Sequence, residues 1–260
     1  MLLPMNQAEW KLRRELRKGS QKSRGYCLRC LRSPLTCYCD NLQRFDPKIQ
    51  FVILIHGREA QKRIATGRMA HLSLENSLLI SGYDYSGNAK VNDLLRDPGN
   101  HCVVLYPGKG SLDLSSLPPQ ERIPLFPSDK KLVVFVIDGT WITARKTMQR
   151  SENLQKLPRI CFEPTRPSNF RVRKQPQENF FSTIEAIHET IELIGPAKGF
   201  DTSTRIHDSL LRVFDSMVDQ QIELSNRPKL YCQWSPRNGP HSRNNPPPEG
   251  LETPPPRPRP

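Results

Sequence analysis

The sequence contains no apolar run near the ~20 residues that a membrane-spanning helix requires. Its first ten residues, MLLPMNQAEW, turn polar after three apolar residues, which is unlike a secretory signal. No internal repeat is visible, and the GKGS stretch at 108–111 lacks the spacing of a phosphate-binding loop. We therefore expect a soluble, cytoplasmic protein without a membrane partner.

Acidic residues are also scarce. The 260-residue chain has 26 Asp and Glu against 39 Lys and Arg, which gives a formal net charge of +13. Such a surplus suits a polyanionic partner, most often a nucleic acid and less often an anionic membrane surface. Residues 9–32 hold nine of the basic residues against Glu9 and Glu15. We expect residues 1–23 to form a basic arm, either a solvated charge run or an RNA-contacting segment.

Three nearly continuous apolar runs stand out in the middle of the chain, at residues 49–55, 102–106 and 132–137. Runs of this kind are typical of strands that are buried on both faces of a parallel sheet. Helical stretches alternate with them. The order predicts an α/β domain over residues 46–224, with a mostly parallel sheet and flanking helices.

The end of that domain is predicted to be helical. Apolar periodicity indicates helices over residues 183–194 and 204–222, with Asp201 and Thr202 as caps of the second. Composition then changes abruptly, because residues 226–260 hold 11 of the 25 prolines. We expect residues 225–260 to form a disordered, Pro-rich tail.

Four of the seven cysteines, Cys27, Cys30, Cys37 and Cys39, fall within thirteen residues. In a reducing compartment this clustering favours a metal site over a disulfide framework, and four thiolates suit tetrahedral Zn²⁺. A redox role for the Cys27–Cys30 pair is the main alternative, but no strand precedes the pair and a second pair follows. We expect one structural zinc ion held by residues 24–45.

The clearest strand, at residues 132–137, is followed by Asp138-Gly139-Thr140-Trp141. Ligands of open α/β sheets bind beyond the carboxyl ends of strands, so a carboxylate there is well placed for chemistry. Asp138 is a candidate general base or orienting group, and Trp141 offers a stacking surface. The alternative is an N-cap Asp beside a core Trp.

Residues 141–175 carry nine Lys and Arg against Glu152 and Glu163, with Phe162 and Phe170 between them. Basic residues neutralise phosphates and aromatic rings stack on unpaired bases, which indicates RNA binding. A solvated loop with two core phenylalanines is the alternative.

Ser182 and Thr183 open the helix that is expected over residues 183–194. Backbone N–H groups at a helix start suit an anion such as a ligand carboxylate. Taken alone, the two residues are equally consistent with ordinary helix capping.

Together these motifs resemble the DTW-domain family, the tRNA-uridine aminocarboxypropyltransferases. The family signature Asp-x-Thr-Trp corresponds to residues 138–141. Two departures are Gly57, where the family usually has Pro, and Phe170, where it has Tyr. The other matching residues, in chain order, are Cys27, Cys30, Cys37 and Cys39; His56, Glu59, Thr66, Gly67 and Arg68; Ala144, Arg145 and Lys146; Leu157, Pro158 and Arg159; Ser168 and Arg171; and Ser182, Thr183, Glu185 and Ala186.

The resemblance implies a fold related to the SPOUT superfamily, in which a knotted region of an α/β sheet binds S-adenosylmethionine. It also implies transfer of the donor's 3-amino-3-carboxypropyl group to N3 of a uridine in tRNA, with release of methylthioadenosine. The alternatives are an RNA methyltransferase that uses the same donor and a non-catalytic, zinc-containing RNA-binding protein. A monomer is expected.

The resemblance further implies roles for individual residues, with Asp138 as the base that removes the N3 proton. The catalytic group comprises Asp138, Thr140 and Trp141; the donor pocket comprises Leu157, Phe170, Ser182 and Thr183; and the RNA-binding group comprises Arg145, Lys146, Arg171 and Arg173. Of the last group, Arg145, Arg171 or Arg173 holds either the donor carboxylate or an RNA phosphate.

Overall fold

The structure, a computed structural model, describes residues 25–62, 64–172 and 180–226. The expected basic arm, Arg173 and the tail beyond Asn226 lie outside these ranges. The chain divides into two units between Ile222 and Glu223. Of the second unit, only Glu223–Asn226, the end of helix α8, is described, so the fold below is that of the first.

Six parallel strands form one sheet in the order β2-β1-β5-β3-β6-β4. The strands are β1 (Gln50–His56), β2 (Ser77–Gly82), β3 (Asn100–Leu105), β4 (Leu112–Asp113), β5 (Lys131–Asp138) and β6 (Arg159–Cys161). The three apolar runs of the sequence form the central strands β1, β5 and β3. The predicted α/β fold with a parallel sheet is therefore confirmed. The knot that the family resemblance implies stays a prediction.

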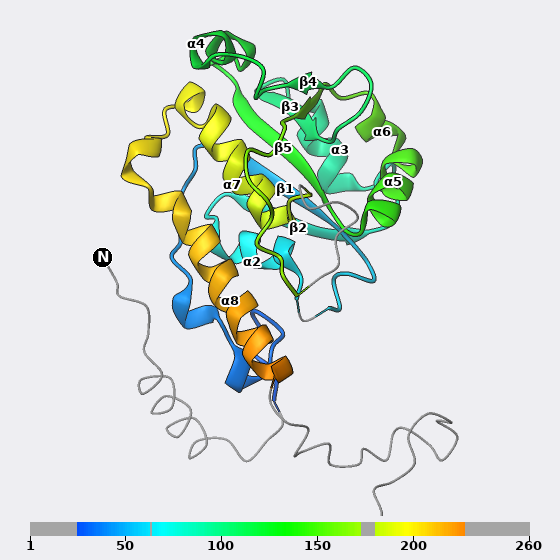
Figure 1. Ribbon diagram of the computed structural model, residues 1–260. Coiled ribbons are helices and arrows are strands. Elements are labelled where there is room, and N and C mark those ends of the chain that lie inside the picture. Colours follow the sequence, from blue (N-terminus) through cyan, green and yellow to red (C-terminus); the bar gives the residue numbers. More distant parts are fainter. Residues whose placement is uncertain (1–24, 63, 173–179, 227–260) are drawn as a thin grey trace, which may run out of the picture. The chain divides into compact units, whose positions relative to one another are not determined.

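Helices cover both faces of this sheet, as Figure 1 shows. They are α2 (Thr66–Ser73), α3 (Ala89–Arg96), α4 (Pro119–Arg122), α5 (Trp141–Arg150), α6 (Glu152–Gln155), α7 (Thr183–Ile194) and α8 (Ser209–Asn226), with short 3₁₀ turns at Pro34–Thr36, Cys39–Asn41, Ile123–Leu125, Pro196–Lys198, Thr202–Thr204 and Ile206–Asp208. Alternate side chains of each central strand point to opposite faces. Phe51 and Ile53 of β1 pack with α2, α7 and α8, whereas Val52 and Leu54 pack with α3, α5 and α6.

Helix α7 forms because its apolar residues recur at helical spacing and face the sheet. Ile184, Ile187, Ile191 and Ile194 recur at helical spacing and are all fully buried against the sheet. The helix spans the predicted residues 183–194.

The prediction of one helix from Thr204 to Ile222 is wrong at its start. Arg205 has a φ of 53°, a left-handed conformation that no α-helix continues through, so α8 begins only at Ser209. Asp201 caps the preceding 3₁₀ turn by accepting a hydrogen bond from the Ser203 N–H. Among the helices that the structure describes, none is both long and apolar enough to cross a membrane.

Candidate functional site

Asp138 is the last residue of the central strand β5, at the carboxyl end of the sheet, and is 6% exposed. Its neighbour in β1 is Ile55. The N-cap of the following helix α5 is Thr140, whose side chain accepts a hydrogen bond from the Thr143 N–H. Asp138 is therefore not the cap of that helix, and the carboxylate is directed elsewhere.

The first turns of two other helices surround the Asp138 carboxylate. Thr183, at the start of α7, donates a hydrogen bond of 2.6 Å from its hydroxyl to Asp138 Oδ1. Gly67, at the start of α2, lies so close that a methyl group on its Cα would overlap the Asp138 carboxyl group and Ile53. Because helix N-termini carry partial positive charge, this edge of the sheet suits anions.

Tyr85 lies below this edge and is completely buried. Its hydroxyl donates towards the backbone oxygens of Ile55 and Ile80, each at 3.1 Å. Burial raises the pKa of Tyr85 far above its usual value, and the negative charge of Asp138 adds a smaller increase. The phenol therefore stays protonated and packs as a neutral support.

Glu185 joins the start of α7 to the segment that follows β6. This fully buried carboxylate accepts hydrogen bonds from the Ser182 N–H and hydroxyl, at 2.8 and 2.7 Å. It also accepts from the Ser168 hydroxyl at 2.7 Å and the Asn169 N–H at 2.9 Å. Two of the family-like motifs thus meet at one carboxylate, which positions Ser182 and Thr183.

Trp141 is half-buried at the first position of α5, and its ring lies 4.6 Å from that of Phe180, between centroids. Arg145 and Lys146 are exposed on the same helix. Arg145 follows Trp141 by one helical turn, so both lie on one side of α5. An aromatic pair and a basic strip thus flank the exit from β5.

The remaining predicted site residues of the described chain have contacts of their own. Phe170 is buried in the core, with its ring edge-to-face with Phe214 of α8 at 5.4 Å. Leu157 packs in the layer of α3, α5 and α6, on the face opposite to Thr183. Arg171 is exposed and ion-paired with Asp219 of α8. The donor-binding and RNA-binding roles assigned to them stay predictions.

His56 ends β1, one strand away from Asp138, and is largely buried. Burial lowers the pKa of His56, and the nearby Glu59 opposes that shift. The His56 ring packs edge-to-face with Tyr83 at 4.6 Å. A side chain at Gly57 would overlap the Tyr83 ring. Tyr83 is exposed, so its ring could move to make room for a larger residue.

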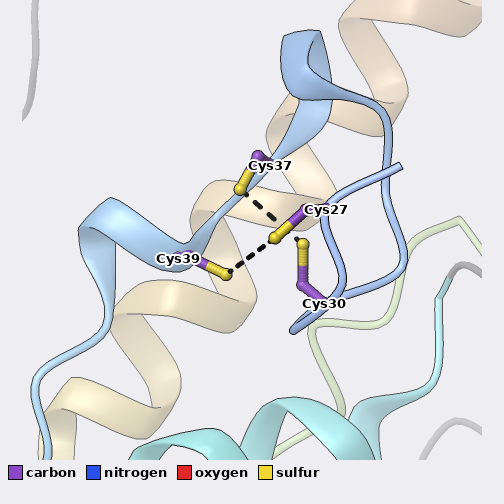
Figure 2. Close-up of side chains that lie close together, drawn as sticks. All are labelled: Cys27, Cys30, Cys37 and Cys39. Carbon is purple, nitrogen blue, oxygen red and sulfur yellow. Dashed lines mark hydrogen bonds between the residues drawn. The ribbon is translucent and has the colours of Figure 1, made fainter. Parts of the chain in front are cut away.

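The four clustered cysteines converge, as Figure 2 shows. The sulfur atoms of Cys27 and Cys39 are 3.7 Å apart, as are those of Cys30 and Cys37, and all four lie within 4.8 Å of one another. Four sulfurs at ~2.3 Å from a tetrahedral Zn²⁺ are about 3.8 Å apart. The donor set and its spacing therefore fit zinc.

The thiols differ in their electrostatic surroundings. Burial would raise the pKa of Cys27, but backbone N–H groups of Cys30 and Arg29, with neighbouring thiols, lower it to about 7. Burial raises the pKa of Cys37 to about 11 and raises that of Cys39 further. Zinc binding would require all four thiols as thiolates, since metal coordination deprotonates thiols outright.

The cysteine segment is docked along helix α8. The Arg32 guanidinium donates to Gln220 Oε1 at 3.4 Å, and the Gln220 amide donates to the Leu35 carbonyl at 3.4 Å. Arg212 donates to Gln43 Oε1 at 3.0 Å. The segment thus packs against α8, the longest helix among the described residues.

Sequence reasoning assigned no site role to Gly67 or Glu185, although both lie in the family-like motifs. For Glu185 the signal was present, because Ser followed three residues later by Glu is typical of a capping box. For Gly67 no local pattern indicates a contact with a carboxylate at the end of a distant strand.

A family model of the DTW domain matches residues 24–222, and the chain therefore belongs to the DTW-domain family. The match includes the four cysteines, Asp138 and Thr183, and it confirms the resemblance drawn from the motifs. Within this family, the chain is similar to tRNA-uridine aminocarboxypropyltransferase 2 of Drosophila melanogaster. The two are 24% identical over 205 residues, which cover 77% of this chain and 76% of that protein. No solved structure matches the chain.

Proposed function

We propose that this protein transfers the 3-amino-3-carboxypropyl group of S-adenosylmethionine to N3 of a uridine in tRNA. Membership of the DTW-domain family and the name of the Drosophila relative support a transferase acting on tRNA uridine. The observation that carries the proposal is the buried Asp138 carboxylate at the end of β5, held by the Thr183 hydroxyl.

Asp138 has the chemistry that this reaction demands. Uridine N3 is protonated at neutral pH, so its attack on carbon needs a nearby base. In the proposed step, N3 bonds to the Cγ of the donor's methionine moiety while the bond between Cγ and sulfur breaks. The N3 proton passes to Asp138, and methylthioadenosine leaves as a neutral thioether.

The donor must be held so that its Cγ, rather than its methyl group, faces the acceptor. The enzyme's main contribution is then orientation. We assign the donor's carboxylate to the start of α7, where Ser182 and Thr183 present a helix N-terminus. The Trp141–Phe180 pair offers an aromatic surface for the donor's adenine or for the target base.

The tRNA is proposed to lie along α5. Arg145 and Lys146 are exposed there, and phosphate neutralisation by such side chains drives RNA affinity. The chain's net charge of +13 fits the same partner. Thr140 caps α5, so its proposed contribution is to hold Trp141 and the basic strip in place.

Zinc is proposed for the Cys27, Cys30, Cys37 and Cys39 site, with a structural role. The spacing of the sulfurs fits the ion, and four protein ligands leave no open position for a substrate. The ion would tie two short turns together in a segment that packs on α8.

One experiment tests the reaction. The purified protein is incubated with S-adenosylmethionine and unmodified tRNA, and the nucleosides are analysed by mass. Uridine gaining an aminocarboxypropyl group, together with release of methylthioadenosine, supports the proposal. A gained methyl group would identify a methyltransferase, and an unchanged tRNA that binds the protein would identify a non-catalytic RNA-binding protein.

A further inference from the structure

A second cluster of metal-ligating side chains lies where helix α7 meets the 3₁₀ turn before α8. His188 and Glu192 are four residues apart on α7, and so share one face. His207 and Asp208 come from the turn Ile206–Asp208. One ligand atom from each of the four residues lies within 4.8 Å of all the others.

Small shifts of these atoms, apart in two pairs and together in a third, would give them the spacing of metal ligands. His188 Nε2 lies 2.9 Å from Asp208 Oδ1, and His207 Nε2 lies 3.0 Å from Glu192 Oε1. The distance from His207 Nε2 to Asp208 Oδ1 is 4.0 Å. Nitrogen and oxygen ligands at ~2.0–2.2 Å from tetrahedral Zn²⁺ are about 3.4 Å apart, in the middle of this range.

The two histidines are deeply buried and incompletely satisfied. His207 is 0% and His188 4% exposed, and their rings stack with centroids 4.8 Å apart. His207 Nε2 faces Glu192 at close range without the alignment of a hydrogen bond, and within the described residues it has no other hydrogen-bond partner. Buried polar atoms are rarely left in this state, and each such atom calls for an explanation.

We propose that His188, Glu192, His207 and Asp208 form a second Zn²⁺ site, separate from the four cysteines, that ties α7 to the start of α8. Two imidazoles and two carboxylates are a ligand set that zinc and neighbouring first-row divalent ions accept.

Arg205 supplies positive charge to the two carboxylates of this cluster. Its guanidinium contacts both carboxylates, donating to Asp208 Oδ2 from Nε at 3.0 Å and to Oδ1 from Nη2 at 2.7 Å, and pairing with Glu192. The side chain is 52% exposed, so it can swing into solvent when a divalent ion binds. Arg205 therefore competes with the metal, and removing it should strengthen metal binding.

The test of this site uses neither tRNA nor S-adenosylmethionine, so its outcome is independent of the proposed reaction. The purified full-length protein, with its cysteine site loaded with zinc, is titrated with Co²⁺, and the absorption spectrum is recorded. Thiolate ligands give intense sulfur-to-cobalt bands, whereas imidazole and carboxylate ligands do not. We expect one further Co²⁺ to bind with weak bands of tetrahedral cobalt and no sulfur-to-cobalt band, and Zn²⁺ to displace it.

Matched variants assign the ligands. His188→Gln and Glu192→Gln should weaken Co²⁺ binding by more than the roughly 10–100-fold that loss of a mere outer-shell partner costs. Glu189→Gln, a neighbour on α7 outside the cluster, should bind normally. Arg205→Asn should bind more tightly, and Asn tolerates the left-handed backbone at this position.

The proposal is overturned if the wild-type protein takes up no further Co²⁺. It is equally overturned if Glu189→Gln lowers the affinity as much as Glu192→Gln, or if Arg205→Asn folds and binds Co²⁺ no more tightly than the wild type. The Arg205→Asn variant still tests the proposal if the ligand variants fail to fold. If the cluster were only a structural ion-pair network, Arg205→Asn would lose stability and would not gain metal affinity.

Discussion

The hydroxyl of Thr183 is hydrogen-bonded to the Asp138 carboxylate at 2.6 Å, across a sequence separation of 45 residues. The bond joins the first turn of α7 to the end of β5. The position of the Asp138 carboxylate is therefore set by two elements, and it changes if either moves. Glu185, which anchors the same turn of α7, acts on Asp138 indirectly through Thr183.

Replacing Asp138 with Asn is expected to lower aminocarboxypropyl transfer by about 10²–10⁴-fold, the usual contribution of a general base. The amide keeps the shape of the side chain and still accepts the Thr183 hydrogen bond, but it takes up no proton. Single-turnover transfer to tRNA measures the effect, and binding of S-adenosylmethionine is the control. Transfer at the wild-type rate would remove Asp138 from the chemistry.

Thr183→Val should lower transfer by roughly 10–100-fold, because the carboxylate loses the hydroxyl that fixes its position, and a displacement of about 1 Å in a catalytic group can cost about 10²-fold. Thr183→Ser retains the hydroxyl and should restore most of the rate. Thr190→Val is the matched control on the same helix. Within the described residues, the Thr190 hydroxyl donates a hydrogen bond to the Ala186 carbonyl of α7 and to no other group. Equal losses in both Val variants would indicate a general defect of α7.

Gly67→Ala is expected to displace the Asp138 carboxyl group, because the new methyl group would overlap it. Overpacking of this kind typically costs about 1–3 kcal/mol of stability. Thermal unfolding and transfer should both be impaired. Gly87→Ala, where a methyl group would meet open space, should change neither. If the two alanine variants behave alike, Gly67 does not restrain Asp138.

Cys37→Ser should remove the sulfur-bound metal and lower the unfolding temperature by several degrees, as each kcal/mol is worth ~2–4 °C in a chain of this size. Transfer by the protein that remains folded should be nearly normal, since the segment packs on α8. Cobalt substitution reports on the site through its sulfur-to-cobalt bands. Cys102→Ser, outside the cluster, is the control and should keep them. Loss of transfer without loss of stability would contradict a structural role.

Arg145→Gln combined with Lys146→Gln should weaken tRNA binding and reduce its salt dependence. Each phosphate contact on a single strand contributes about −0.7, and on a duplex about −0.9, to the slope of log affinity against log salt concentration. Lys131→Gln is the control, since Lys131 is exposed at the opposite end of β5 from Asp138. If the α5 double variant and Lys131→Gln change the salt-dependence slope equally, the RNA does not bind along α5.

The central strands were predictable from the sequence because strands buried on both faces must be continuously apolar, as residues 132–137 are. Strand β6 was not, because three residues within a basic stretch carry no periodicity. The break before α8 was missed for another reason. Arg205 adopts a left-handed conformation, which an arginine in the sequence does not predict. The cysteine cluster was predictable from spacing alone, since its ligands are close in the chain.

Contacts between distant segments could not be predicted from local sequence patterns. The motif around Asp138 and the motif at Ser182 were each visible in the sequence, and the family resemblance listed both together. Their hydrogen bond, however, depends on how α7 packs across the sheet. The cluster of His188 and His207 was missed for the same reason, because its halves belong to different elements.

The buried carboxylate of Glu185 links two points of the chain that are distant in sequence. It accepts hydrogen bonds from both Asn169 and Ser182, so one side chain fixes these two points of the backbone relative to each other. A buried carboxylate that loses such a partner is left unsatisfied, at a cost of about 1–3 kcal/mol or more. A substitution that displaces either point therefore also disturbs the contact between Thr183 and Asp138, although neither of these two residues is changed.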